Sequence, residues 1–173
     1  ILESTGIPYT HSGVISSALA MDKEISKKIF KKNNILTPKY FCYSFNLSKK
    51  DLIKRIDHKI KFPVVIKPIN EGSSVNVFIC NKKNFFKNLK KLNNEKEILI
   101  EKYIPGREIQ VAIMGNKKLG TIELVPKRKF YDYKAKYDKR ANTKHILPVQ
   151  LSKKKLREVE NIALKAHKIT GCK

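Results

Sequence analysis

Apolar and polar residues follow two periods along this chain, one typical of helices and one typical of strands. Between Gly13 and Lys32 the apolar side chains recur with largely helical spacing, and the pattern predicts two helices that break near Met21 and Asp22. Asp22 is a plausible N-cap for the second of these helices. Further helices are predicted over residues 49–58, capped by Ser48, over 82–92, and over 153–169, capped by Ser152 and ended by Gly171.

Short apolar runs between the helices predict strands. The β-branched run Val64-Val65-Ile66 is bounded by two prolines, so we expect a strand that is covered on both faces. Asn116 and Gly120 are expected to mark a hairpin turn. The predicted strands are residues 40–43, the run ending at 67, 75–80, 97–103, 111–114, 119–125 and 145–147. Helices and strands alternate, which predicts an α/β or α+β fold.

Lys67 stands at the end of a predicted buried strand, directly before the polar loop Glu71-Gly72-Ser73-Ser74-Val75. An ammonium group in that position is costly unless an anion meets it. Gly72 would let the backbone approach a ligand, and the hydroxyls of Ser73 and Ser74 stand beside freed N–H groups, so the loop could hold a triphosphate. On these residues alone, an ordinary strand-end lysine followed by a surface turn is an equal alternative.

Two later segments also carry candidate chemistry. Residues 98–104 form an apolar strand whose polar end leads to Glu108, and its carboxylates and backbone groups could pair with a nucleoside. A strand end with solvated acids is the ordinary alternative. Residues 130–137 are aromatic and charged without helical or strand periodicity, which predicts an ordered loop that closes over a ligand. That loop could instead stack on single-stranded nucleic acid.

The composition is strongly basic, with 38 Lys and Arg residues against 15 Asp and Glu and a formal charge of +23. A surplus of this size predicts attraction to polyanions. Only five of the basic residues are arginine, the favoured reader of phosphates and guanines, and the lysine pairs are spread over several predicted helices. We interpret most of the surplus as solvated surface and expect no specific nucleic-acid partner, although a lysine-rich nucleic-acid-binding module stays open as the alternative from a different class.

Cysteine spacing and hydropathy exclude several other classes. Cys42, Cys80 and Cys172 have no C-x-x-C spacing and do not pair with the four histidines as zinc ligands would. Neither a disulfide framework nor a structural zinc is expected. The chain has no run of 18 apolar residues and no signal-peptide pattern at its start, which predicts a soluble, cytoplasmic protein without a membrane partner.

Taken in order, the motifs of this chain resemble the D-alanine:D-alanine ligases of the ATP-grasp superfamily. The resemblance is carried by Gly6-Ile7-Pro8-Tyr9-Thr10, Ser17-Ala18-Leu19 with Met21-Asp22-Lys23, Ile66-Lys67-Pro68, residues 71–75, Ile100-Glu101-Lys102, residues 130–137 and Gly171-Cys172-Lys173. It implies an ATP-grasp fold in three parts. These are the end of an N-terminal domain over residues 1–20, a central lobe over 21–104, and an incomplete C-terminal lobe over 105–173.

The resemblance also implies a role for particular residues in binding ATP. Lys23 and Lys67 would grip the phosphates, and Ser73 with Ser74 would close over phosphates and substrate. Glu101, Lys102 and the backbone of Tyr103 and Ile104 would frame adenine, and Glu108 would bind the ribose hydroxyls.

Two further roles concern the reacting groups. Lys136 would reach the transferred γ-phosphate, and Tyr137 would position D-alanine together with Ser73. Asn76 departs from the glycine usual in the family, although asparagine tolerates a positive φ. Lys134 departs from a place that is often acidic, which changes the charge of the closing loop.

The implied reaction joins two D-alanine molecules through an acyl phosphate formed with ATP, for peptidoglycan precursor synthesis. The Mg²⁺ ligands are expected beyond Lys173, so we expect these 173 residues alone to be inactive. The complete protein would be a homodimer. A D-alanine:D-lactate ligase or another ATP-grasp carboxylate–amine ligase is the nearest alternative, and Tyr137 favours the dipeptide product.

Overall fold

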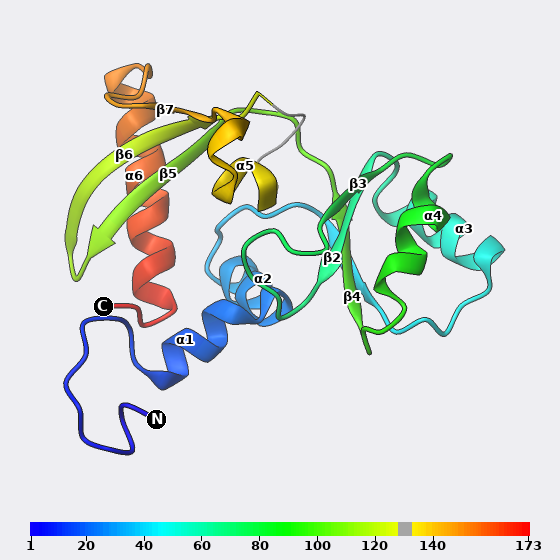
Figure 1. The fold of residues 1–173 in the computed structure, drawn as a ribbon, viewed down its shortest axis with the longest axis horizontal. Coiled ribbons are helices and arrows are strands. Elements are labelled where there is room, and N and C mark those ends of the chain that lie inside the picture. The colour runs from blue at the N-terminus through cyan, green and yellow to red at the C-terminus, as the bar shows by residue number, and fades with distance from the viewer. Residues whose placement is uncertain (128–132) are drawn as a thin grey trace.

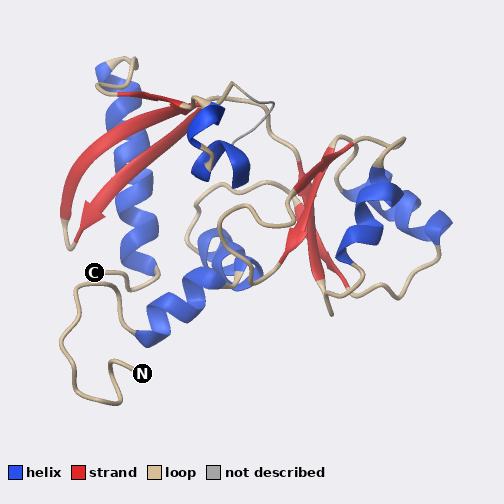
Figure 2. Cartoon of the chain, viewed as in Figure 1, coloured by secondary structure: helices blue, strands red, loops and turns tan. Residues whose placement is uncertain are grey.

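The computed structural model describes residues 1–127 and 133–173. Its elements in chain order are α1 (Val14–Met21), α2 (Lys23–Lys32), β1 (Tyr40–Tyr43), α3 (Lys49–Lys59), β2 (Val64–Pro68), β3 (Phe78–Cys80), α4 (Phe85–Leu89), η1 (Lys90–Leu92), β4 (Ile98–Lys102), β5 (Glu108–Met114), β6 (Lys117–Val125), α5 (Tyr133–Tyr137), η2 (Lys139–Ala141), β7 (Lys144–Ile146) and α6 (Lys153–Ile169). The strands form two antiparallel sheets, and α2 lies between them (Figure 1). The mixed helix and strand content confirms the predicted α/β (α+β) class (Figure 2).

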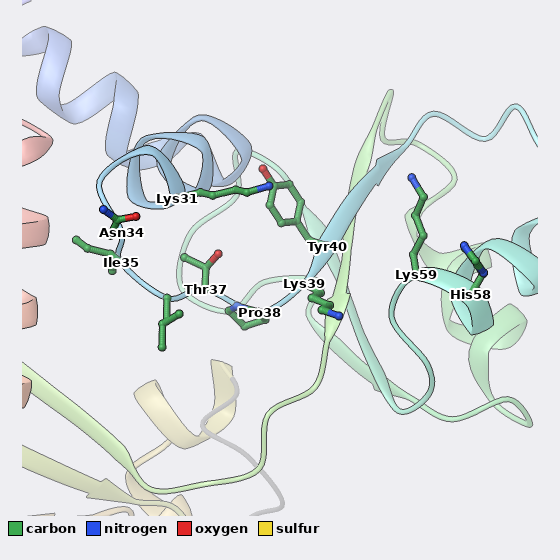
Figure 3. A pocket seen from close by; sticks show the side chains of 10 residues that line it. Lys31, Asn34, Ile35, Thr37, Pro38, Lys39, Tyr40, His58 and Lys59 are labelled. Carbon is green, nitrogen blue, oxygen red and sulfur yellow. The ribbon is translucent and has the colours of Figure 1, made fainter.

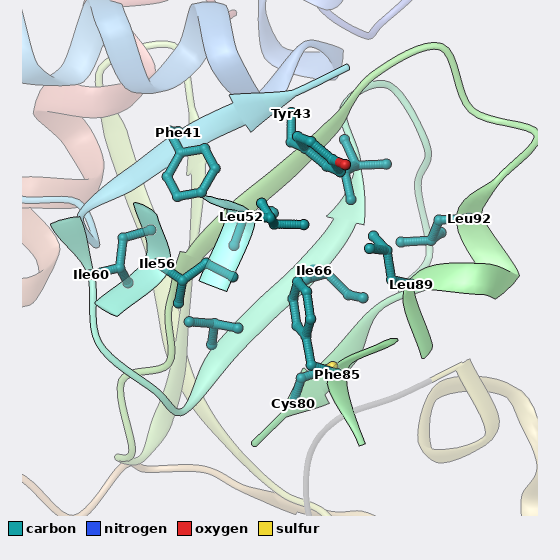
Figure 4. Packing of buried hydrophobic residues seen from close by; sticks show 13 residues of the cluster. Phe41, Tyr43, Leu52, Ile56, Ile60, Ile66, Cys80, Phe85, Leu89 and Leu92 are labelled. Atoms are coloured by element: carbon teal, nitrogen blue, oxygen red, sulfur yellow. The ribbon is translucent and has the colours of Figure 1, made fainter. Parts of the chain in front are cut away.

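The first sheet has the strand order β1-β4-β2-β3, and α3 and α4 cover its outer face. Alternate residues point to that face, so Val64 and Ile66 are fully buried there together with Leu52 and Ile56 of α3 and Phe85 of α4 (Figure 4). This cluster is the main hydrophobic core of the described residues, and burial of its apolar surface stabilises the lobe.

The opposite face of this sheet is covered unevenly. Along β2 the burial alternates, with Val65 and Lys67 half-buried between fully buried neighbours. Along β4 every residue from Ile98 to Glu101 is buried. The expectation that β2 is covered on both faces was therefore wrong, because only its outer face packs into the core. The incomplete cover leaves Lys67 accessible at one end of the inner face.

Three predicted N-caps are confirmed. The side chains of Asp22, Ser48 and Ser152 each accept a hydrogen bond from the backbone N–H three residues further on, at 2.8, 3.2 and 3.3 Å. Each bond satisfies one donor that a helix start leaves without an intrahelical partner. Helix α6 ends before Gly171, whose φ of +71° glycine adopts without strain.

The second sheet has the order β5-β6-β7, and α6 packs against β5 and β6 (Figure 1). The β5–β6 turn consists of Gly115 and Asn116, as the asparagine predicted. The expected turn residue Gly120 instead lies inside β6, paired with Ala112 next to a shift in strand register. Its placement in the turn was wrong because β6 begins earlier than its apolar residues suggest, at the polar Lys117.

Several other predicted elements also differ from the structure, among them the strand expected over residues 111–114, which begins at Glu108. The strand expected from residue 75 begins at Phe78, because left-handed residues up to Asn76 interrupt an extended chain. The helix expected from residue 82 begins at Phe85, because the Asn81 side chain accepts from two following backbone N–H groups and forms a turn there. Residues 133–137, expected in a loop, form α5, and residues 130–132 of that expected loop lie outside the described residues.

The described helices also bear on the expectation about membranes. Among the helices of residues 1–127 and 133–173, none combines the length and the apolar character needed to cross a bilayer.

Candidate functional site

The centre of the site is a buried carboxylate, that of Glu101 on β4. Strand register places Tyr40 of β1 and Val65 of β2 opposite Glu101, so all three point to the inner face of the sheet. The Lys27 ammonium on α2 lies 2.7 Å from Oε2 of Glu101, and the Lys67 ammonium on β2 contacts Oε1. Two cations therefore share one anion at a place where both the Glu101 and the Lys27 side chains are only 9% exposed.

Burial disfavours the charged form of two lysines at this site, Lys27 and Lys23. It lowers the pKa of Lys27 from its ordinary value, and the charge of Lys67 lowers it further, while the contact with Glu101 raises it. Burial also lowers the pKa of Lys23, again with a further contribution from Lys67. The three lysines exceed the one central carboxylate in charge, so an anionic ligand would relieve their repulsion.

Lys23 is the first residue of α2 and ties that helix to the polar loop after β2. Its backbone N–H and its ammonium donate to the carbonyl of Ile69 at 3.1 and 3.0 Å, and the ammonium also donates to the carbonyl of Glu71. The two lysines predicted to bind phosphates are thus brought to the same end of the sheet, one from a helix start and one from a strand end.

A cavity of about 530 Å³ opens beside these lysines. Its lining includes Lys23, Lys27, Lys67 and Glu101, residues 35–38, Ala166 and His167 of α6, and Thr170 directly after that helix. Two buried polar atoms in the described chain lack a hydrogen-bond partner, Oε2 of Glu101 and Nε2 of His167. Glu101 Oε2 is close enough to Lys27 for an ion pair but keeps hydrogen-bonding capacity for a ligand.

The loop that follows β2 has the backbone conformation expected of a ligand clamp. Ser73, Ser74 and Asn76 have φ values of 51°, 58° and 55°, in the left-handed region that costs energy for residues other than glycine. The positive φ of Asn76 agrees with the tolerance of asparagine for this region. Gly72, which we expect to let the backbone approach a ligand, does not have a positive φ, and no atom lies within 4 Å of the position that a Cβ would take there.

The loop meets α5 through a contact between two predicted site residues. The hydroxyl oxygens of Ser73 and Tyr137 lie 2.7 Å apart, although the residues are 64 positions apart in sequence. Tyr137 and Tyr133 lie one helical turn apart, with ring centroids 4.8 Å from each other and ring planes tilted by 48°. This pair at i, i+4 supports α5 and is the local signal that the sequence analysis missed.

Glu108 and Lys136 also influence each other. Desolvation raises the pKa of the Glu108 carboxyl, and the positive charge of Lys136 opposes that change. Glu108 begins β5, whereas Lys136 belongs to α5. The structure thus brings the residue predicted for ribose and the residue predicted for the γ-phosphate within electrostatic range.

The remaining predicted residues lie at the end of β4. The Lys102 ammonium donates to the carbonyls of Lys61 and Phe62 at 3.2 Å, and so it points away from Glu101, on the other face of the strand. The Tyr103 N–H donates to the carbonyl of Pro63 at 3.2 Å. Ile104 is 61% exposed. Any contact of this segment with a purine would therefore use backbone groups other than the Tyr103 N–H.

These residues do not form a magnesium site. Mg²⁺ takes oxygen ligands in an octahedral arrangement. Glu101 is the single carboxylate among the described residues that line the cavity, and it is already paired with Lys27 and Lys67. A separate group of Glu24, Cys42 and Glu97 has ligand atoms within 4.8 Å of one another, but Lys28 pairs with Glu24 and Ser44 donates to Glu97. Burial and these carboxylates raise the pKa of the Cys42 thiol to about 12.

A neighbouring cavity of about 690 Å³ contains none of the predicted site residues. It lies between the segment that joins α2 to β1 and the end of α3, and its lining includes Lys31, Lys39, His58 and Lys59 (Figure 3). The cavity beside Glu101 is therefore the one that three of the predicted site residues line, Lys23, Lys67 and Glu101.

Two residues of the site were missed by the sequence analysis. Lys27 follows Lys23 by one helical turn and so lies on the same face of α2, a spacing that could have drawn attention to it. His167 carried no such signal, because a histidine in the last turn of an amphipathic helix is ordinary.

Comparisons with known proteins identify relatives of this chain. The profile of the family described as "D-ala D-ala ligase C-terminus" matches residues 29–173. A D-alanine–D-alanine ligase of Pelagibacter ubique (strain HTCC1062) is 65% identical over 173 residues, which is 100% of this chain and 57% of the relative. The crystal structure of the D-alanine–D-alanine ligase of Bacillus anthracis is 36% identical with a TM-score of 0.80, over 99% of this chain and 55% of that one.

A second structure of the B. anthracis ligase, complexed with ATP, is 30% identical with a TM-score of 0.75, over 99% of this chain and 53% of that one. The chain thus spans little more than half the length of the relatives that it matches. Its fold is the ATP-grasp fold of these neighbours, and the chain belongs to the D-alanine–D-alanine ligase family.

Proposed function

We propose that the complete protein containing this chain joins two D-alanine molecules into D-alanyl-D-alanine at the expense of ATP. The observation that carries the proposal is the contact of 2.7 Å between Ser73 and Tyr137. It joins two lobes at the place where a substrate would have to be enclosed. Lys23, Lys67 and Glu101 converge on the cavity nearby. The likeness to a ligase complexed with ATP supports the same nucleotide here.

Most of the predicted site residues can then be given a specific role. Lys23 and Lys67 bind the phosphates, and Glu101 frames adenine with a carboxylate whose Oε2 also lies 2.7 Å from the Lys27 ammonium. Glu108 binds ribose hydroxyls, and the backbone near Tyr103 and Ile104 borders the purine.

The residues of the closing elements act on the reacting groups. Lys136 faces the terminal phosphate, and Ser73, Ser74 and Tyr137 hold D-alanine and exclude water. ATP, when bound, supplies the phosphoryl group that activates a carboxylate. Positioning and charge neutralisation by lysines suit this chemistry better than a nucleophilic side chain does.

We also propose a division of the chain into the end of a first domain over residues 1–20, a central lobe over 21–104 and part of a third domain over 105–173. The separation of the two sheets between β4 and β5 supports the second boundary. We propose a cytoplasmic homodimer for the complete protein, with Mg²⁺ held by residues outside this chain.

Phosphate release from ATP by the complete protein tests the proposal. With magnesium present, release should require D-alanine, should not respond to L-alanine, and should yield the dipeptide. A D-alanine–D-lactate product in the presence of both substrates would instead assign a depsipeptide ligase. Absence of any D-alanine-dependent release would overturn the proposed function and shift the search to other acid and amine substrates.

A further inference from the structure

The surroundings of Lys27 differ from those of the other lysines at the site. Its ammonium lies 2.7 Å from Glu101 Oε2, donates to the carbonyl of Pro38 at 3.2 Å, and stands 4.9 Å from the centre of the Tyr40 ring. A carboxylate, a carbonyl and an aromatic face thus hold it from three sides. Lys27 is fixed in the protein and has little freedom to follow a ligand.

Lys67 has fewer partners than Lys27 and is more exposed. Its side chain is 19% exposed, about twice the exposure of the Lys27 and Glu101 side chains, and its contact is with Glu101 Oε1. It extends from a strand whose inner face is only half-buried and lines the cavity. Of the two lysines paired with Glu101, Lys67 is the one that can turn toward an arriving phosphate.

A transfer of Lys67 from Glu101 to a phosphate changes the charge balance at the carboxylate. If Lys67 were the sole partner, its departure would leave an ionised carboxylate buried without a counter-ion, which is strongly unfavourable. Lys27 removes this penalty because it occupies the other carboxylate oxygen and stays there. Each of the two lysines thus contacts its own carboxylate oxygen. This arrangement suits a site in which Lys67 can leave Glu101 while Lys27 remains paired with it.

We propose that Lys27 is a positioning residue for nucleotide binding: it is the permanent counter-ion of Glu101, and it releases Lys67 to bind phosphate. The inference rests on the proposed function, because it assumes that ATP occupies the cavity. Lys27 does not touch the phosphates in this arrangement. It acts through Glu101, so its removal should weaken binding of the phosphates of ATP more than binding of the nucleoside.

The first test compares ATP and adenosine binding to the complete protein by calorimetry. Lys27→Met should raise the Kd for ATP by about tenfold or more, because Lys67 is then retained by Glu101, and should change the Kd for adenosine by less than about threefold. Lys27→Arg keeps the charge and should recover most of the ATP affinity. Lys28→Met removes an exposed ion pair with Glu24 on the same helix and serves as the matched control, with both affinities unchanged.

Equal losses for ATP and adenosine, as local unfolding would cause, would overturn the proposal, and so would an unchanged ATP affinity. If the parent protein binds no ATP, the proposed function itself fails, which separates the two failures.

The second test repeats the comparison in a Glu101→Gln background, where no buried carboxylate charge needs a counter-ion. Lys27→Met should then change the ATP affinity by less than about twofold, since its effect passes through Glu101. This background also covers the case in which Lys27→Met alone does not fold. A further tenfold loss in the double variant would show that Lys27 acts on the nucleotide without Glu101, contrary to the proposal.

Discussion

Three residues of one loop, Ser73, Ser74 and Asn76, adopt left-handed backbone conformations between β2 and β3. Each such residue other than glycine costs about 1 kcal/mol or more, so the loop conformation must be held by its contacts. One of these contacts is the Ser73 hydroxyl, which lies 2.7 Å from that of Tyr137. The loop and α5 therefore hold each other in place at the residues that we assign to D-alanine.

Replacement of Tyr137 by phenylalanine in the complete protein removes one hydroxyl from this contact. Loss of one hydrogen bond of about 1 kcal/mol should raise the KM for D-alanine five- to tenfold, while the Kd for ATP changes by less than about twofold. Steady-state kinetics with varied D-alanine would measure the effect. Tyr133→Phe keeps the ring that contacts Tyr137 and removes a hydroxyl that is not assigned to substrate, so it serves as the control. A KM for D-alanine equal to that of the parent would contradict the role of Tyr137.

Helix α2 is the element that organises the site. Asp22 caps its start, and the next residue, Lys23, reaches the loop after β2, while Lys27 one turn later reaches Glu101. One short helix thus places two of the three lysines at the cavity. Its position depends on a side-chain cap at the end that faces the ligand.

Asp22→Ala should therefore affect both stability and function. Loss of the hydrogen bond to the Ile25 N–H should cost about 1 kcal/mol of unfolding free energy and should weaken ATP binding severalfold through displacement of Lys23. Asp22→Asn keeps a capping oxygen and should stay within about 0.3 kcal/mol of the parent. Chemical denaturation and ATP titration of the complete protein measure the two effects. Loss of stability without any change in ATP affinity would show that the Asp22 cap does not contribute to ATP binding.

Elements with local causes could be predicted from the sequence, and elements with distant causes could not. The caps at Asp22, Ser48 and Ser152 were correct because a helix start is decided within four residues. The start of β3 was wrong because Asn76 and its neighbours adopt conformations that the apolar pattern does not encode. Helix α5 was missed because its five residues have too few apolar positions to show a period.

The site was predicted in part for the same reason. The family resemblance pointed to Lys23, Lys67 and Glu101. From the residues alone, Lys67 could equally be an ordinary lysine at the end of a strand. The pairing of Lys27 with Glu101 depends on how α2 lies over β4. In a chain with 38 basic residues, the spacing of one helical turn from Lys23 places Lys27 on the same face of α2 but does not by itself predict its pairing with Glu101.

The charge of the whole molecule is distributed unevenly between site and surface. Lys27 is buried and paired, whereas many lysines outside the site, such as Lys28 and Lys82 with side chains 62% and 60% exposed, extend into solvent. Exposed charges attract polyanions through counterion release, which depends steeply on salt, while charges partly removed from water are screened less. The formal charge of +23 and the cavity beside Glu101 should therefore respond differently to ionic strength.

A salt titration of the complete protein separates the two kinds of binding. Affinity for a single-stranded oligonucleotide should fall by about three hundredfold or more between 50 and 200 mM salt if six or more phosphates are contacted, as in diffuse electrostatic binding. ATP affinity should fall far less, because its phosphates meet Lys23 and Lys67 in a partly buried cavity where Glu101 and Lys27 hold the geometry. A scrambled oligonucleotide of equal length is the control and should behave identically. Oligonucleotide binding that persists at 200 mM salt and distinguishes the two sequences would show that part of this lysine-rich surface recognises nucleic acid, contrary to our interpretation of it as a solvated surface.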